Sequence, residues 1–326
     1  MFHNKELYLQ FKFVLMISRR LVRVKVLQSL YAWNRTTNAQ DVNPFKSDLL
    51  DRIDQTHEMY LFLLDLPYVL QNYALEKKEK EQSKFYPDSA KVRKFSLLEG
   101  TALAKKIHEQ LLIQSTNSRF DWNELESSFG EWYNQLYEWD FAQDYGIFLE
   151  PNTQQQHEFI ESLFYVFLET HEAFNNLLEE IYPAWTSDSQ FIVKELAKTI
   201  NAFPEDIKVS ISKPTTQKSE EVLLAVRLLE ETIENSEKYD SLIASVTQNW
   251  DPSRIATMDL LIIKLALTEF LYCPEIPLKV TINEYLEITK DYSSQNSSKF
   301  VNGIMDKLRI DLSNKGEIHK SGRGLK

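Results

Sequence analysis

The sequence predicts an all-α protein, and three observations support this fold class. The 326 residues include only seven glycines and ten prolines, so long stretches carry no residue that breaks a helix. Apolar residues recur at helical spacing through much of the chain, as in Phe300, Ile304 and Leu308. Prolines and polar clusters separate these periodic stretches, as expected for helices joined by loops.

The first predicted helix, from Ser18 to Asn34, is basic within an acidic protein. The chain has a net charge of −11, which argues against a protein that coats nucleic acids non-specifically but not against a local basic patch. Arg19, Arg20 and Arg23 fall at i, i+1 and i+4, so they project from one side of the first helical turns. Arginine suits phosphate binding because its planar group donates paired hydrogen bonds. The alternative is a solvated basic helix end.

Residues 41–214 are predicted to form a series of long helices, with a linker over residues 203–218. The alternating charges of residues 76–81 predict a solvated helix face. The aromatic-rich stretch 122–141 has acidic neighbours, which favours a core or a protein-contact surface over base stacking. The expected helices cover about residues 44–84 (kinked at Pro67), 88–114, 122–137, 154–181 and 187–202.

Residues 215–312 form a second predicted helical region, which ends in a three-helix unit. Asp251 and Pro252 have the types expected at an N-cap and a first helical position. Thr281 and Glu284 have capping-box spacing and predict the start of the next helix. A polar break then precedes a last helix through Phe300. We expect the tail, residues 313–326, to be disordered.

The chain resembles the NusB family of bacterial transcription antitermination factors. Three blocks, in matching order and spacing, carry this resemblance, and the first helix matches at Arg19-Arg20, Arg23, Gln28, Leu30-Tyr31 and Trp33. From about residue 219 to residue 308 the likeness is nearly continuous. The blocks are Arg254-Ile255-Ala256 with Met258-Asp259, Ile276–Val280 with Ile282-Asn283-Glu284, and Ser298–Gly303 with Asp306-Lys307-Leu308.

This resemblance implies a NusB-like helical bundle and a set of partners. Proteins of this family bind the boxA element of nascent ribosomal RNA transcripts together with NusE, a ribosomal protein of the small subunit, and assemble on RNA polymerase. By motif position, the implied RNA contacts are Arg19, Arg20, Arg23, Asn296, Lys299 and Phe300, and the implied protein contacts are Tyr31 and Glu269. Ile304, four residues after Phe300, leaves burial of that ring equally open.

The chain departs from the family pattern in three ways. Leu21 and Val22 interrupt the basic run, and the position of Asn296 is commonly acidic in the family. Family members are also commonly about half this length, so much of residues 41–214 is an extended additional helical region. We expect this region to act as a protein contact or a structural buttress.

No catalytic constellation is evident in the sequence. It has no glycine-rich phosphate loop, and its six histidines are never paired at helical metal-binding spacing. We therefore expect a non-enzyme without cofactor or metal. We do not expect a ribosomal RNA methyltransferase, because such an enzyme would need a Rossmann-like domain after residue 308. The remaining alternative is a helical protein–protein scaffold without direct RNA binding, and a homodimer stays open.

We expect a cytoplasmic protein without a membrane partner. The single cysteine, Cys273, excludes an internal disulfide and fits a reducing compartment. The apolar stretch from Leu7 to Ile17 is too short to span a bilayer and lacks a signal-peptide cleavage site. We expect residues 1–17 to be a disordered extension, and both Met1 and Met16 fit as the translation start.

Overall fold

The computed structural model confirms the all-α class. It describes residues 12–14, 18–36, 41–114, 119–148, 150–202, 210–212, 219–247, 255–294 and 297–321. The chain divides into two compact units. Unit 1 comprises residues 1–16 and 54–214, and unit 2 comprises residues 17–53 and 215–326. Among the described helices, none is long and apolar enough to cross a membrane.

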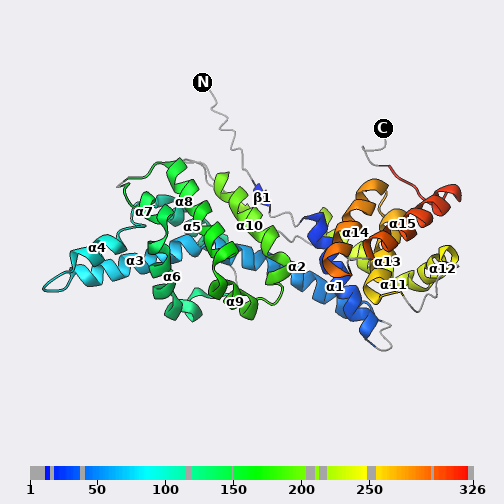
Figure 1. Ribbon diagram of the computed structural model, residues 1–326, viewed down its shortest axis with the longest axis horizontal. Helices are drawn as coiled ribbons and strands as arrows, with labels where there is room; N and C mark the ends of the chain where they lie inside the picture. Colours follow the sequence, from blue (N-terminus) through cyan, green and yellow to red (C-terminus); the bar gives the residue numbers. More distant parts are fainter. Residues whose placement is uncertain are drawn as a thin grey trace, which may run out of the picture. The chain divides into compact units, whose positions relative to one another are not determined.

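Unit 2 is a helical bundle centred on α13 (Thr257–Tyr272) (Figure 1). Residues 261–270 of α13 are all buried, because neighbouring helices cover it on all sides. The neighbours that pack against it are α1 (Arg19–Arg35), α11 (Glu220–Glu234), α12 (Ser236–Val246), α14 (Leu278–Tyr292) and α15 (Ser297–Asn314). The first part of α2 (Asn43–Leu64) completes the unit.

Three helix starts in unit 2 can be compared with the sequence. Ser18 caps α1 by accepting a hydrogen bond from the Leu21 amide at 3.1 Å. The helix α13 starts at Thr257, later than predicted, and Asp251 and Pro252 lie outside the described residues. The prediction that Thr281 opens α14 was wrong. That helix starts at Leu278, directly after Pro277, and the Thr281 hydroxyl is buried inside the bundle.

The segment after α15, described to residue 321, contacts α13 where we expected a disordered tail. After α15, the Lys320 ammonium donates hydrogen bonds of 2.8 Å to the carbonyl oxygens of Glu269 and Cys273. These carbonyls lie at the C-terminal end of α13, where a cation is favourable, and they also accept backbone hydrogen bonds from Cys273 and Ile276. Lys320 therefore supplies a cap that the sequence pattern does not reveal.

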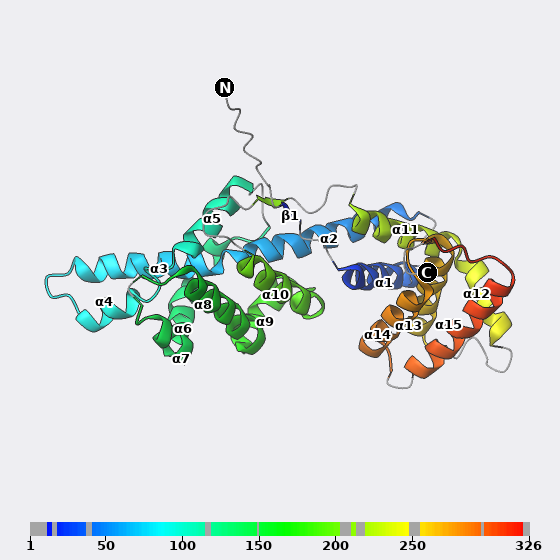
Figure 2. The same ribbon diagram turned by 90° about the horizontal axis from the view of Figure 1, so that it is seen from above.

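Unit 1 contains the second part of α2 and the helical region that follows it (Figure 2). Two short strands, β1 (Lys12–Val14) and β2 (Ser210–Ser212), pair in parallel, although we expected no regular structure in either segment. The remaining elements are α3 (Leu66–Gln82), α4 (Ser89–Phe95), α5 (Ala102–Gln114), the 3-10 helix η1 (Trp122–Ser128), α6 (Phe129–Glu138), α7 (Asp140–Tyr145), α8 (Thr153–Tyr165), the π-helix η2 (Val166–Thr170), α9 (Glu172–Ile181) and α10 (Trp185–Asn201).

Several long predicted helices of unit 1 are divided. The predicted kink at Pro67 is a break, in which α2 ends at Leu64, Asp65 is the N-cap of α3 and the proline occupies its first turn. The helix predicted over residues 88–114 is interrupted by a turn over residues 96–101, which contains Gly100. Helical periodicity continues across such short breaks, so it does not place them.

The aromatic stretch of residues 122–141 contributes to the core of unit 1. Trp132 and Tyr133 are buried, and Trp132 meets Phe174 edge-to-face at 4.9 Å. Trp122 is partly buried and stacks on Phe62, with ring centroids 3.9 Å apart. These contacts favour the core alternative for this stretch.

Candidate nucleic-acid interface

The candidate interface begins at the N-terminal turns of α1, where three arginines have different environments. Arg19 and Arg20 have side chains about half exposed, at 50% and 49%. The side chain of Arg23 is only 1% exposed. Only Arg19 and Arg20 can therefore reach a ligand in solvent, which revises the expectation that all three contact RNA.

Arg23 forms a buried ion pair with Glu269 of α13. Its Nε and Nη2 atoms donate hydrogen bonds of 2.8 and 2.7 Å to the two carboxylate oxygens. Burial alone would lower the pKa of Arg23, but the hydrogen bonds from this guanidinium to Glu269 more than offset it and raise the pKa. Arg23 stays charged and fastens α1 to α13.

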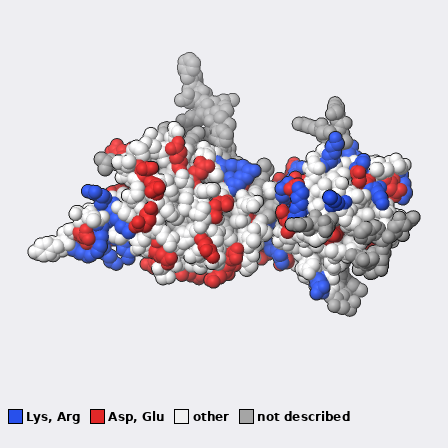
Figure 3. Space-filling model, viewed as in Figure 1, with Lys and Arg blue, Asp and Glu red and all other residues white. Residues whose placement is uncertain are grey.

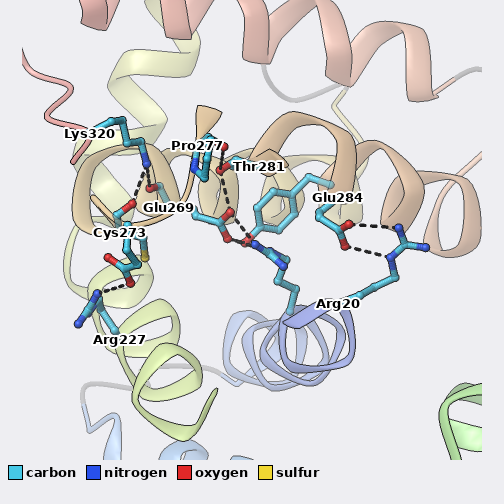
Figure 4. A network of polar contacts seen from close by, with 11 residues as sticks. Arg20, Arg227, Glu269, Cys273, Pro277, Thr281, Glu284 and Lys320 are labelled. Atoms are coloured by element: carbon cyan, nitrogen blue, oxygen red, sulfur yellow. Dashed lines mark hydrogen bonds and ion pairs between the residues drawn. The ribbon is translucent and has the colours of Figure 1, made fainter. Parts of the chain in front are cut away.

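Glu269 joins three helices through its carboxylate (Figure 4). Besides Arg23, it accepts a 2.7 Å hydrogen bond from the Thr281 hydroxyl and a 3.3 Å hydrogen bond from the Tyr285 hydroxyl, both from α14. The Arg23 guanidinium also lies 5.7 Å from the Tyr285 ring centroid. Glu269 is 0% exposed, so it cannot contact a protein partner in this structure, and its role is to hold the bundle together.

Arg20 pairs with a carboxylate on the surface. Its Nε and Nη2 atoms donate to Glu284 of α14 at 3.0 and 3.3 Å, as Figure 4 shows. The hydrogen bond to Glu284, together with the charges of Glu287 and Asp291, raises the pKa of Arg20. Arg19 lies 3.5 Å from Glu220, whose side chain is 84% exposed. Any anionic ligand must therefore compete with carboxylates for both exposed arginines.

The other expected contacts are spread over α1 and α15. Tyr31 of α1 is 40% exposed, which leaves its ring available to a partner. On α15, Lys299 is exposed and Phe300 is partly buried. Asn296 lies outside the described residues.

Arg20 and the start of α15 lie at different levels along α14. Arg20 meets Glu284, and Gln28 meets the Tyr292 hydroxyl at 3.5 Å, eight residues further along both helices. Eight residues of helix span about 12 Å, and α15 begins only after that end of α14. A ligand that touches both Arg20 and Lys299 must therefore span about two turns of α14.

The described residues offer no grouping of three or more histidine, cysteine or acidic side chains that could hold a metal ion. Cys273 is buried at the end of α13, and burial raises the pKa of its thiol to about 12. It is therefore not poised as a nucleophile.

Comparison with known proteins identifies the family. The NusB family model matches residues 194–309. The transcription antitermination protein NusB of Geobacter sp. is 31% identical over 124 residues, which cover 86% of that protein and 38% of this chain. The chain belongs to the NusB family.

Two other NusB proteins match at higher identity over a smaller share of their length. The one from Chloroherpeton thalassium is 39% identical over 133 residues, 41% of this chain and 58% of that protein. The one from Salinibacter ruber is 41% identical over 101 residues, 31% of this chain and 63% of that protein. The chain thus spans about three-fifths of the length of these two relatives. No solved structure matches the chain.

Proposed function

We propose that this NusB-family protein is a transcription antitermination factor that binds boxA-type RNA of nascent ribosomal RNA transcripts. The observation that carries the proposal is the exposed pair Arg19 and Arg20 at the N-terminus of α1. Guanidinium groups on a rigid helix suit phosphate oxygens and base edges. Arg23 supports the site indirectly, because its pair with Glu269 holds α1 in place.

The proposed assembly includes the NusE ribosomal protein and RNA polymerase. Tyr31 is the surface residue that we assign to a protein contact, because it is 40% exposed on α1. We assign Lys299 and Phe300 of α15 to the same RNA, further along its path. The named function of the relatives, transcription antitermination, supports this reading.

A helical protein–protein scaffold without RNA binding is the second candidate. The carboxylates of Glu220 and Glu284 favour it, because they already occupy the exposed arginines. Arg19→Glu with Arg20→Glu would leave the partner binding of such a protein unchanged.

RNA binding by the full-length protein tests the proposal. We would measure affinity for a boxA RNA and a scrambled RNA, with and without NusE, across a salt series. Binding selective for boxA that weakens with salt, and that Arg19→Glu with Arg20→Glu abolishes, is expected. Arg23 must stay intact, because its reversal would bury two like charges. No selectivity with NusE present, and unchanged binding by the double variant, would contradict the proposal.

A further inference from the structure

The hairpin of α3 and α4 in unit 1 carries two exposed aromatic rings at its end. Phe85 and Tyr86 lie in the turn between these helices and are 88% and 84% exposed. Their rings meet edge-to-face, with centroids 4.7 Å apart and planes at 89°. Adjacent, almost fully exposed aromatic rings gain little from folding, so they indicate a binding surface.

The turn that presents these rings is well ordered by hydrogen bonds. Glu81 is 6% exposed, and its carboxylate accepts from the Asp88 amide at 3.1 Å and from the Lys84 ammonium at 2.6 Å. Asp88 in turn caps α4 by accepting from the amides of Ala90 and Lys91. The rings therefore stand on a defined turn, and their removal leaves its hydrogen bonds intact.

The base of the hairpin packs on the rest of unit 1. The Tyr133 hydroxyl donates to the Lys94 carbonyl at 2.7 Å, and the Lys94 ammonium lies 4.8 Å from the Tyr137 ring centroid. Lys78 pairs with Glu99 at 2.5 Å. These contacts hold the hairpin independently of Phe85 and Tyr86.

The hairpin is the basic part of an acidic unit. Residues 76–94 contain seven lysines and arginines and four acidic residues, whereas the rest of residues 54–214 contains seven basic and 23 acidic residues. Figure 3 shows blue side chains beside the white end of the hairpin, and mainly red ones on the rest of this face of unit 1. The exposed cations nearest the turn are Lys80, Lys84, Lys91 and Arg93.

We propose that the α3–α4 hairpin binds single-stranded RNA, with Phe85 and Tyr86 stacking on unpaired bases and the surrounding cations contacting phosphates. Exposed aromatic rings combined with positive charge are the features that bind single strands without sequence preference. Because the ring planes of Phe85 and Tyr86 are perpendicular, the two rings offer faces to two bases rather than one flat surface to a protein. The choice of RNA over another polyanion rests on the proposed function, because boxA lies within a longer transcript that supplies unpaired bases outside boxA.

The test compares two RNAs on the full-length protein, one with boxA alone and one with boxA flanked by unpaired uridines. Phe85→Ala with Tyr86→Ala is expected to weaken binding to the flanked RNA about tenfold or more and leave binding to boxA alone unchanged. The matched control is Tyr165→Ala, which removes a 60% exposed ring of α8 outside the basic hairpin. It is expected to change neither affinity. Lys80→Glu with Arg93→Glu should reduce the salt dependence for the flanked RNA.

The outcomes separate this inference from the proposed function. If the protein lacks boxA selectivity but Phe85→Ala with Tyr86→Ala still weakens binding to the flanked RNA, the hairpin inference stands and the proposed function fails. If boxA binding depends on Arg19 and Arg20 while the hairpin variant binds flanked RNA as the wild type does, the hairpin inference is overturned. Equal losses with Tyr165→Ala, or hairpin-dependent binding to anionic phospholipid vesicles instead of RNA, would also overturn it.

Discussion

In unit 2, arginines of α1 pair with glutamates both in the interior and on the surface. Arg23 and Arg20 lie one helical turn apart on α1, and each makes a two-point contact with a glutamate. The Arg23–Glu269 pair is buried, whereas the Arg20 and Glu284 side chains are 49% and 24% exposed. Burial makes the first pair part of the structure, and exposure leaves the second open to exchange with a ligand.

The largest expected effect is on stability when the buried pair is broken. Arg23→Met leaves the Glu269 carboxylate buried without its cation, which costs about 3–5 kcal/mol of unfolding free energy. Arg20→Met, on the exposed pair, should cost less than about 1 kcal/mol. Urea unfolding of both variants measures these costs. Similar losses of unfolding free energy in the two variants would contradict the difference between the buried and the exposed pair.

Alkaline pH should also act on the interior. Burial raises the pKa of Cys273 from 9.0 to about 12. The unfolded thiol thus loses its proton first, so stability is fully present below about pH 9 and falls as the pH rises towards 12. Tyr285, whose pKa is raised by burial and by the charge of Glu269, acts in the same direction.

Unfolding free energies measured from pH 8 to pH 12 test this effect. Cys273→Ala should reduce the decline relative to the wild type, because the variant has no thiol to ionise. An equally steep decline in the variant would show that Cys273 does not contribute.

A smaller effect is expected when the surface pair is loosened. Glu284→Gln removes the carboxylate that competes with phosphate for Arg20, so affinity for boxA RNA should rise about twofold to fivefold at low salt. The control is Glu275→Gln, whose carboxylate pairs with Arg227 at 3.1 Å on another part of unit 2. Equal changes in both variants would reflect net charge alone.

The sequence predicted the helical region of unit 2, but it misplaced the starts of α13 and α14 and did not separate the two kinds of arginine. Helical periodicity over residues 215–312 predicted the region in which α11 to α14 and most of α15 lie, because apolar spacing marks the buried face of each helix. Arg23 was grouped with Arg19 and Arg20 by charge. The sequence did contain a signal for burial of Arg23. Arg23, Leu27 and Leu30 fall at i, i+4 and i+7, so they share one helix face, and both leucines are buried.

Glu269 shows the same limit of sequence reasoning. It is an acidic residue within a helix that is buried from Leu261 to Phe270, and such a residue needs a buried partner. The partner, Arg23, lies 246 residues away in the chain, so no local pattern could name it. Likewise, the alternating charges of residues 76–81 predicted a solvated helix but not the turn that exposes Phe85 and Tyr86.

A double-mutant cycle on the two arginine–glutamate pairs tests the central comparison most directly. Arg23→Met, Glu269→Gln and their combination, and Arg20→Met, Glu284→Gln and theirs, would be compared by urea unfolding. We predict a coupling of about 2 kcal/mol or more for Arg23–Glu269 and less than about 1 kcal/mol for Arg20–Glu284. Equal coupling energies would contradict the division of α1 into a buried structural pair and an exposed pair available to RNA.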